Sequence, residues 1–143
     1  AVETVLVGGY SGTGKSALVH EIHRPITARR GYFIEGKFDQ FQRSIPYFAF
    51  IEAFRGFVAL LLTENEERLM PLRENIRTAL GSEGKVLTDV LPSLELLIGP
   101  QPDVPEVGGA EAQNRFNYVF RRFVQAICSP DHPLVLFIDD LQW

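Results

Sequence analysis

The run Gly-Tyr-Ser-Gly-Thr-Gly-Lys-Ser at residues 9–16 constrains the fold more than any other part of the sequence. Its glycines indicate a tight backbone turn, because glycine lacks the Cβ that keeps other residues out of positive φ. Thr4–Val7 precedes the turn and is β-branched and apolar, which predicts a buried strand. A helix is predicted from Lys15 to about His23, ended by Pro25. Its packing side chains are expected to be Ala17, Leu18 and Ile22.

Strands and helices are predicted to alternate along the rest of the chain. Gly31–Glu35 is a second strand candidate, and Leu134–Ile138 is a third with five consecutive apolar residues, typical of a strand covered on both faces in a parallel sheet. Helices are predicted over Tyr47–Leu62, Asn65–Leu80 and Gln113–Ile127, with short helices in Val86–Ile98 and a loop over Gly99–Gly109. The alternation predicts an α/β layered domain.

The run at residues 9–16 matches the pattern G-x-x-x-x-G-K-[ST] of a phosphate-binding loop, the P-loop. Such a loop turns successive backbone N–H groups toward phosphate oxygens, and the following helix adds its unpaired N-terminal N–H groups. We predict that Lys15 contacts the β- and γ-phosphates and assists catalysis, and that Ser16 binds Mg²⁺. The residues predicted to contact the nucleotide are Gly9, Tyr10, Ser11, Gly12, Thr13, Gly14, Lys15, Ser16 and Ala17.

Two carboxylates follow the third predicted strand. In P-loop proteins, a buried strand that ends in aspartate places this group beside the Mg²⁺ held by the loop hydroxyl, and we assign that role to Asp139. Asp140 comes directly after it and is predicted to be the catalytic carboxylate that orients or deprotonates the attacking water. An apolar strand followed by an acidic turn is the simpler alternative.

Composition excludes several classes of protein. The chain has 143 residues, 45% of them hydrophobic, and a formal net charge of −4, which is not the composition of a disordered chain. No apolar run approaches the roughly 20 residues of a membrane helix, and no secretion signal is visible. The single cysteine, Cys128, is interpreted as buried and inert, and it favours a cytoplasmic location. The acidic balance argues against nucleic acid as a partner.

Other polar residues have weaker patterns. Arg115, Arg121 and Arg122 are interpreted as an exposed helix face, with contact to a phosphate or a partner as the alternative. The pair His20 and His23 is interpreted as structural rather than as a metal site. Four residues after the second strand are interpreted as a solvated loop, with a place at the ligand-binding sheet edge as the alternative: Lys37, Asp39, Gln40 and Arg43.

With both motifs placed, the chain resembles the AAA-like P-loop domains of signal-transduction ATPases with numerous domains (STAND). More narrowly, it is similar to the ATP-binding segment of large bacterial proteins that join a serine/threonine kinase, this ATPase and a sensor histidine kinase. The stretches that carry the resemblance are residues 9–18, 36–41 (Gly-Lys-Phe-Asp-Gln-Phe), 113–116 (Gln-Asn-Arg-Phe) and 136–143, which ends Asp-Asp-Leu-Gln-Trp.

The resemblance implies a three-layer P-loop NTPase with a mostly parallel sheet in the strand order 5-1-4-3-2. It implies that residues 1–143 are the N-terminal part of this domain, truncated after the Walker B strand, with a helical insert at about residues 40–112. On this basis the piece alone is expected to be poorly stable, and hydrolysis by it alone is doubted. The implied ligands are ATP and Mg²⁺, with slow hydrolysis that switches neighbouring kinase, sensor and histidine kinase domains. A homo-oligomer is left open.

Three other functions stay open. A nucleotide-binding scaffold would hold ATP or ADP without turnover, although the presence of both Asp139 and Asp140 favours hydrolysis. A DNA-associated AAA ATPase would need clustered basic residues, and the most basic window, at residues 24–43, is only modestly so. A small-molecule kinase would need an acceptor site in the segment between the motifs, where no charged cluster stands out.

Overall fold

The computed structural model describes residues 3–41 and 47–139. Its elements, in chain order, are α1 (Lys15–His20), α2 (His23–Ala28), β1 (Tyr32–Lys37), α3 (Phe48–Leu61), α4 (Glu66–Leu80), a 3₁₀ turn (Gly81–Glu83), α5 (Lys85–Thr88), α6 (Leu94–Ile98), α7 (Gly109–Ile127) and β2 (Leu134–Asp139).

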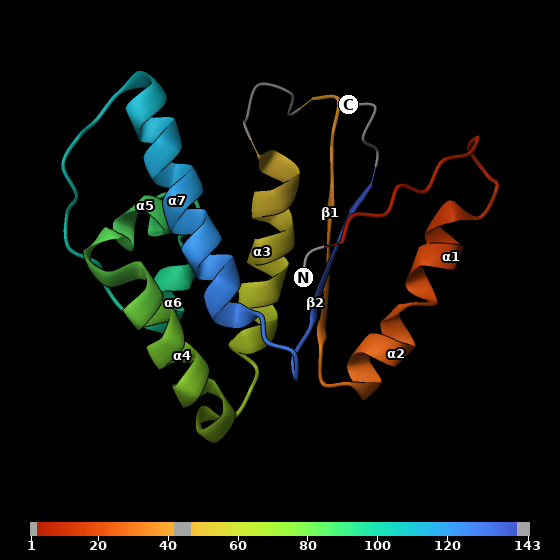
Figure 1. The fold of residues 1–143 in the computed structure, drawn as a ribbon, viewed down its shortest axis with the longest axis horizontal. Helices are drawn as coiled ribbons and strands as arrows, with labels where there is room; N and C mark the ends of the chain where they lie inside the picture. Colours follow the sequence, from red (N-terminus) through yellow and green to blue (C-terminus); the bar gives the residue numbers. More distant parts are fainter. Residues whose placement is uncertain (1–2, 42–46, 140–143) are drawn as a thin grey trace.

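The two described strands pair in parallel, from Tyr32 opposite Leu134 to Lys37 opposite Asp139. Alternate residues of β1 point to opposite faces of this pair. On one face Tyr32 packs edge-on against Phe57 of α3, with ring centroids 4.9 Å apart. On the other face Phe33 contacts His23 of α2, with ring centroids 5.3 Å apart. Figure 1 shows the result, a central strand pair with α3 on one side and α1 and α2 on the other.

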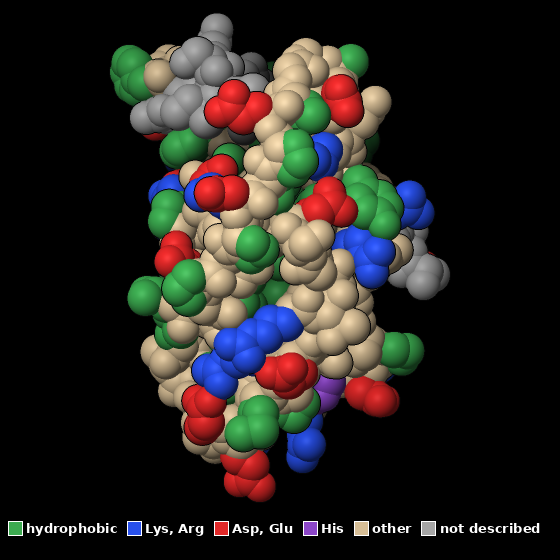
Figure 2. All heavy atoms as spheres, turned by 90° about the vertical axis from the view of Figure 1, so that its left-hand side faces the viewer, with side chains coloured by type: hydrophobic (Ala, Val, Ile, Leu, Met, Phe, Trp, Pro, Cys, Tyr) green, Lys and Arg blue, Asp and Glu red, His purple; other side chains and the backbone are tan. Residues whose placement is uncertain are grey.

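The hydrophobic core lies between the strand pair and α3 to α7. Phenylalanine side chains dominate it: the ring of Phe54 on α3 contacts Phe120 and Phe123 of α7 at 5.2 and 5.6 Å between centroids. Its most buried large side chains are Phe54, Phe57, Phe123, Leu61, Ile76, Leu87, Leu94, Leu97, Val58 and Val119. In Figure 2, which views the helical side, apolar side chains are scattered among charges of both signs. The apolar stripes of these helices therefore face inward.

Most of the predicted elements are confirmed. The helix expected at residues 47–62 is α3, and the helix expected at 65–80 is α4. The side chain of Asn65 accepts a hydrogen bond from Arg68 N at the start of α4, and Gly81 follows its last residue at φ +55°. The short helices α5 and α6 flank Pro92, as expected. The last helix starts earlier than predicted, at Gly109.

The predicted strand Thr4–Val7 is wrong for this structure. Residues 3–10 have no regular secondary structure, and Val5 and Leu6 are each 80% exposed. A strand needs a neighbour that accepts and donates its backbone hydrogen bonds. Within the described residues, β1 and β2 pair with each other and neither pairs with residues 3–10, so this segment stays exposed.

The helix predicted from residue 15 to about 23 is also wrong in its length. It is two short helices, α1 and α2, and Pro25 lies in the first turn of α2, where its missing N–H has no intrahelical acceptor to lose. Leu18 and Ile22 are 64% and 46% exposed, and Val19 is the buried residue of α1. A sheet of two strands offers too little surface to cover more of this helix.

One glycine tests how closely α3 packs on the strands. A Cβ at Gly36 would overlap the backbone carbonyl of Ala49, so Gly36→Ala is expected to push α3 from β1 and destabilise the fold by about 1–3 kcal/mol. Gly56→Ala is the control: its Cβ meets no atom within 4 Å, and alanine stabilises an exposed helix by up to about 1 kcal/mol. Thermal or chemical denaturation of both variants measures this. Equal effects of the two changes would contradict the close approach.

Candidate functional site

The glycine-rich loop uses backbone conformations that only glycine adopts without strain. Gly12 has φ +80°, and Gly14, which directly precedes α1, has φ +91°. The turn is closed by Thr13, whose hydroxyl and N–H both donate to the carbonyl of Tyr10, at 2.8 and 3.3 Å. The loop is exposed to solvent along its length. The local sequence therefore forms a tight turn at these glycines, even though the predicted preceding strand is not formed.

Lys15 places its charge inside this loop. Its Nζ donates to the carbonyl oxygens of Gly9 and, at 2.9 Å, Tyr10. Four backbone N–H groups that follow the turn bond to no acceptor among the described residues: those of Gly14, Lys15, Ser16 and Ala17. An ammonium group and free backbone N–H groups in one loop are donors suited to the oxygens of a phosphate chain.

The second half of the predicted site lies at the carboxyl ends of the strands. Asp139 is the last residue of β2 and Lys37 the last residue of β1, and the two are register partners. The N–H of Phe38 donates to the carbonyl of Asp139 at 3.1 Å, which continues the pairing by one step. Asp140 and Arg43 lie outside the described residues.

The interpretation of Lys37 as part of a solvated loop is wrong, because β1 runs two residues further than predicted. Lys37 is the register partner of Asp139, the predicted metal ligand, and its side chain is exposed at the end of β1. The alternative from sequence, a place at the sheet edge, therefore describes Lys37 better than a loop does.

His20 attaches the loop helix to the strand pair. Its Nε2 lies 3.1 Å from Oε2 of Glu35 in β1, and its ring meets Phe33 and Phe137 edge-on, each at 6.1 Å between centroids. In Figure 1, α1 begins and both strands end toward the upper side of the view. The Nζ of Lys15 bonds to carbonyl oxygens within the loop, while Lys37 and Asp139 are register partners at the ends of the strands. The loop and the strand ends are thus built by separate elements, and His20 links α1 to β1.

Three of the remaining candidates have structural contacts. Arg115 is half-buried and donates to the carbonyl of Pro105, so its interpretation as part of an exposed helix face is wrong. His23 Nδ1 lies 3.4 Å from the hydroxyl of Thr27, and within residues 3–41 and 47–139 no group of three or more His, Cys, Asp or Glu could hold a metal ion. Cys128 is half-buried, and this burial raises the pKa of its thiol. A raised pKa keeps the thiol protonated at neutral pH, in agreement with its interpretation as inert.

Comparisons with known proteins agree with these observations. A family model described as an AAA ATPase domain matches residues 1–143. The chain is 38% identical over 140 residues to a hybrid signal transduction histidine kinase, histidine kinase G of Dictyostelium discoideum. The match covers 98% of this chain and 4% of the relative, so the chain spans a small part of the protein it matches. No solved structure matches significantly.

The matched relative can be compared with the signalling role and the bacterial origin expected from the sequence. A hybrid histidine kinase as relative agrees with the expected place of the domain in a signalling protein. The relative does not support a bacterial origin, since it comes from Dictyostelium discoideum. None of the helices in the described part of the chain has the length and apolar character needed to cross a membrane. With a family model that matches over its whole length, the chain belongs to the AAA ATPase domain family.

Proposed function

We propose that this domain binds ATP with Mg²⁺, hydrolyses it slowly, and uses the nucleotide state as a switch within a large multidomain signal-transduction kinase. The observation that carries the proposal is the loop at residues 9–16, which combines the Lys15 ammonium, free backbone N–H groups and glycines at positive φ. The family supports nucleotide binding and ATPase chemistry in general. The histidine kinase relative supports a role in signalling.

The residues present fit a nucleotide with a metal ion. Carboxylate and hydroxyl oxygens are the ligands that Mg²⁺ prefers, and Asp139 and Ser16 would supply them. The metal would neutralise charge on the β- and γ-phosphates. Lys15 would hold the same oxygens from the loop side, exchanging its bonds to loop carbonyls for bonds to phosphate. Asp140 would orient or deprotonate the attacking water.

Assembly of this site needs the P-loop and the strand ends to meet. The loop is already folded, whereas the segment before it is exposed and not paired. We infer that residues 4–7 join the sheet in the complete protein, as the first strand of a three-layer P-loop domain. That strand would carry the loop to the edge where Asp139 ends β2, and P-loop proteins bind nucleotide at this edge.

Two alternatives to the switch remain, and each has a distinct outcome. A scaffold that binds ATP or ADP without turnover would show nucleotide affinity and no phosphate release. A DNA-associated ATPase would be stimulated by DNA in a salt-dependent way, but the net charge of −4 does not favour it.

Removing the loop cation tests nucleotide binding. In the full-length protein, Lys15→Ala is expected to weaken ATP binding at least about tenfold, because a charge-assisted contact to the phosphates is lost. Titration with a fluorescent ATP analogue measures the affinity. Lys85→Ala is the matched control, since Lys85 is paired with Asp89 on α5, away from the loop. Unchanged affinity in Lys15→Ala would contradict the proposed phosphate site.

Removing the second carboxylate separates a hydrolysing switch from a scaffold. Asp140→Asn is expected to keep ATP affinity within about twofold and to lower kcat by about 10²-fold or more, because water activation is lost while the phosphate contacts remain. Phosphate release under single-turnover conditions gives the rate. Equal rates for the wild type and Asp140→Asn would remove this residue as the catalytic carboxylate.

The loop conformation gives an independent test. Alanine at Gly14 would have to adopt φ +91°, at a cost of about 1–2 kcal/mol, so Gly14→Ala is expected to distort the turn and reduce ATP affinity. Gly8→Ala is the control, because Gly8 is not at positive φ and its Cβ would meet no atom within 4 Å. Calorimetric titration with ATP compares the two. A loss of affinity as large in Gly8→Ala would argue against a specific role for the turn.

A further inference from the structure

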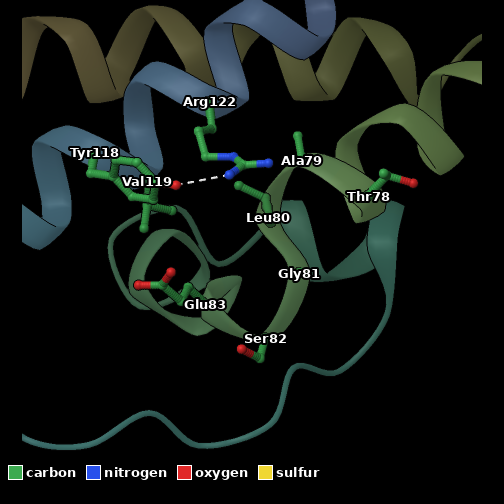
Figure 3. Close-up of a pocket in the computed structure, with 9 residues that line it drawn as sticks. All are labelled: Thr78, Ala79, Leu80, Gly81, Ser82, Glu83, Tyr118, Val119 and Arg122. Carbon is green, nitrogen blue, oxygen red and sulfur yellow. Dashed lines mark hydrogen bonds between the residues drawn. The ribbon is translucent and has the colours of Figure 1, made fainter.

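A groove runs between α4 and α7 on the helical side of the molecule, away from the P-loop. Its larger part is a cavity of about 730 Å³ that extends toward Cys128 and Ser129 at the end of α7. Its smaller part, of about 170 Å³, lies beside the turn Gly81–Glu83. Figure 3 shows this smaller part, with Arg122 and Tyr118 reaching from α7 toward the end of α4. We name the two parts together the α4–α7 groove.

The larger part of the groove carries the opposite charge to the chain, while Glu83 lines the smaller part together with Arg122. Arg121 and Arg122 line its larger part, and no acidic side chain does, although the net charge of the whole chain is −4. Neither arginine has a carboxylate partner among the described residues. By contrast, the α4 arginines Arg73 and Arg77 are paired with Glu66 and Glu74, and both donate to carbonyls at the end of α6. The groove therefore presents two guanidinium groups that pair with no carboxylate among the described residues.

One of these cations is held in place. The Nη1 of Arg122 donates to the hydroxyl of Tyr118 at 2.8 Å, and its guanidinium carbon lies 5.6 Å from the centre of the tyrosine ring. Tyr118 is one turn earlier on α7, so both groups are on the same face of the helix. A guanidinium restrained in this way loses less freedom when it binds an anion, which favours binding.

The other groups in the groove suit a peptide chain. Asn75 on α4 and Gln125 on α7 line it from its two sides, and each amide side chain offers donors and an acceptor that match a peptide backbone. Ala79 and Ala126 add small apolar surface between the polar groups. Two arginines are too few for a nucleic-acid surface, which neutralises phosphates along a track.

We propose that the α4–α7 groove docks an acidic peptide segment, with two carboxylates on Arg121 and Arg122 and the peptide backbone between Asn75 and Gln125. The surface is separate from the nucleotide site and goes beyond the function proposed above. It gives the helical part of the domain a contact for an acidic segment of a partner protein. Because the arginines are exposed, replacing them leaves the core of the fold intact.

Peptide binding by the full-length protein tests this proposal. The probe is a short fluorescein-labelled peptide of alternating glutamate and alanine, followed by anisotropy at low and at physiological ionic strength. Arg121→Gln/Arg122→Gln is expected to weaken its binding at least about tenfold. Arg24→Gln/Arg29→Gln is the matched control, since it removes the same charge from exposed positions on and next to α2. Tyr118→Phe, which keeps the ring but removes the hydroxyl that restrains Arg122, is expected to weaken binding by a smaller factor.

Three results would overturn the proposal. They are an acidic peptide that does not bind, binding that is equal in the groove variant and the control variant, and binding of a phosphoserine peptide with none of the glutamate peptide. A neutral peptide of glutamine and alanine gives the baseline, and equal binding of it would also count against the proposal. Thermal denaturation of each variant confirms that the fold is retained, and ATP affinity is expected to stay unchanged.

Discussion

The parallel pairing of β1 with β2 is the contact on which the rest of the structure depends. It joins segments far apart in the chain, and α3 to α7 fill the sequence between them. The helix α3 packs closely on this pair because Gly36 has no side chain to hold the backbone of Ala49 away. That approach buries the aromatic side chains of α3 against α7. The core, the position of Asp139 and the attachment of α1 through His20 all follow from the pair.

The two sides of the strand pair differ in how many side chains are buried against them. The α3 side has a continuous core with side chains such as Phe57, Val58 and Phe123 almost fully buried. The side with α1 and α2 has one buried residue in those helices, Val19, and contacts made through partly exposed side chains such as His20 and Glu35. Such exposed pairs contribute little stability. The P-loop is therefore locally folded but weakly attached, as expected when the strand that leads into it has no neighbour.

The arginines of α4 have structural partners, whereas two arginines of α7 have no carboxylate partner among the described residues. Arg73 and Arg77 connect α4 to the end of α6 by bonds to carbonyl oxygens, and each also pairs with a glutamate of its own helix. Arg121 and Arg122, on the neighbouring helix, have no such partners in the described part of the chain. The proposed nucleotide site and the proposed docking groove would therefore lie on different elements of the fold.

The sequence by itself determined the turns, helix ends and helix faces, because each depends on residues that are close together in the chain. Glycines at positions 12 and 14 determine the turn of the P-loop, Asn65 and Gly81 mark the ends of α4, and the spacing of Phe116 to Ile127 determines the buried face of α7. The nucleotide motif was readable for the same reason. Only the tertiary structure decided which strands form, because a strand exists through hydrogen bonds to a neighbour that its own residues do not specify. For this reason the strand predicted at residues 4–7 is not formed, and Lys37, predicted in a loop, ends β1 opposite Asp139. The α4–α7 groove likewise could not be predicted, because it lies between two helices that are distant in the sequence.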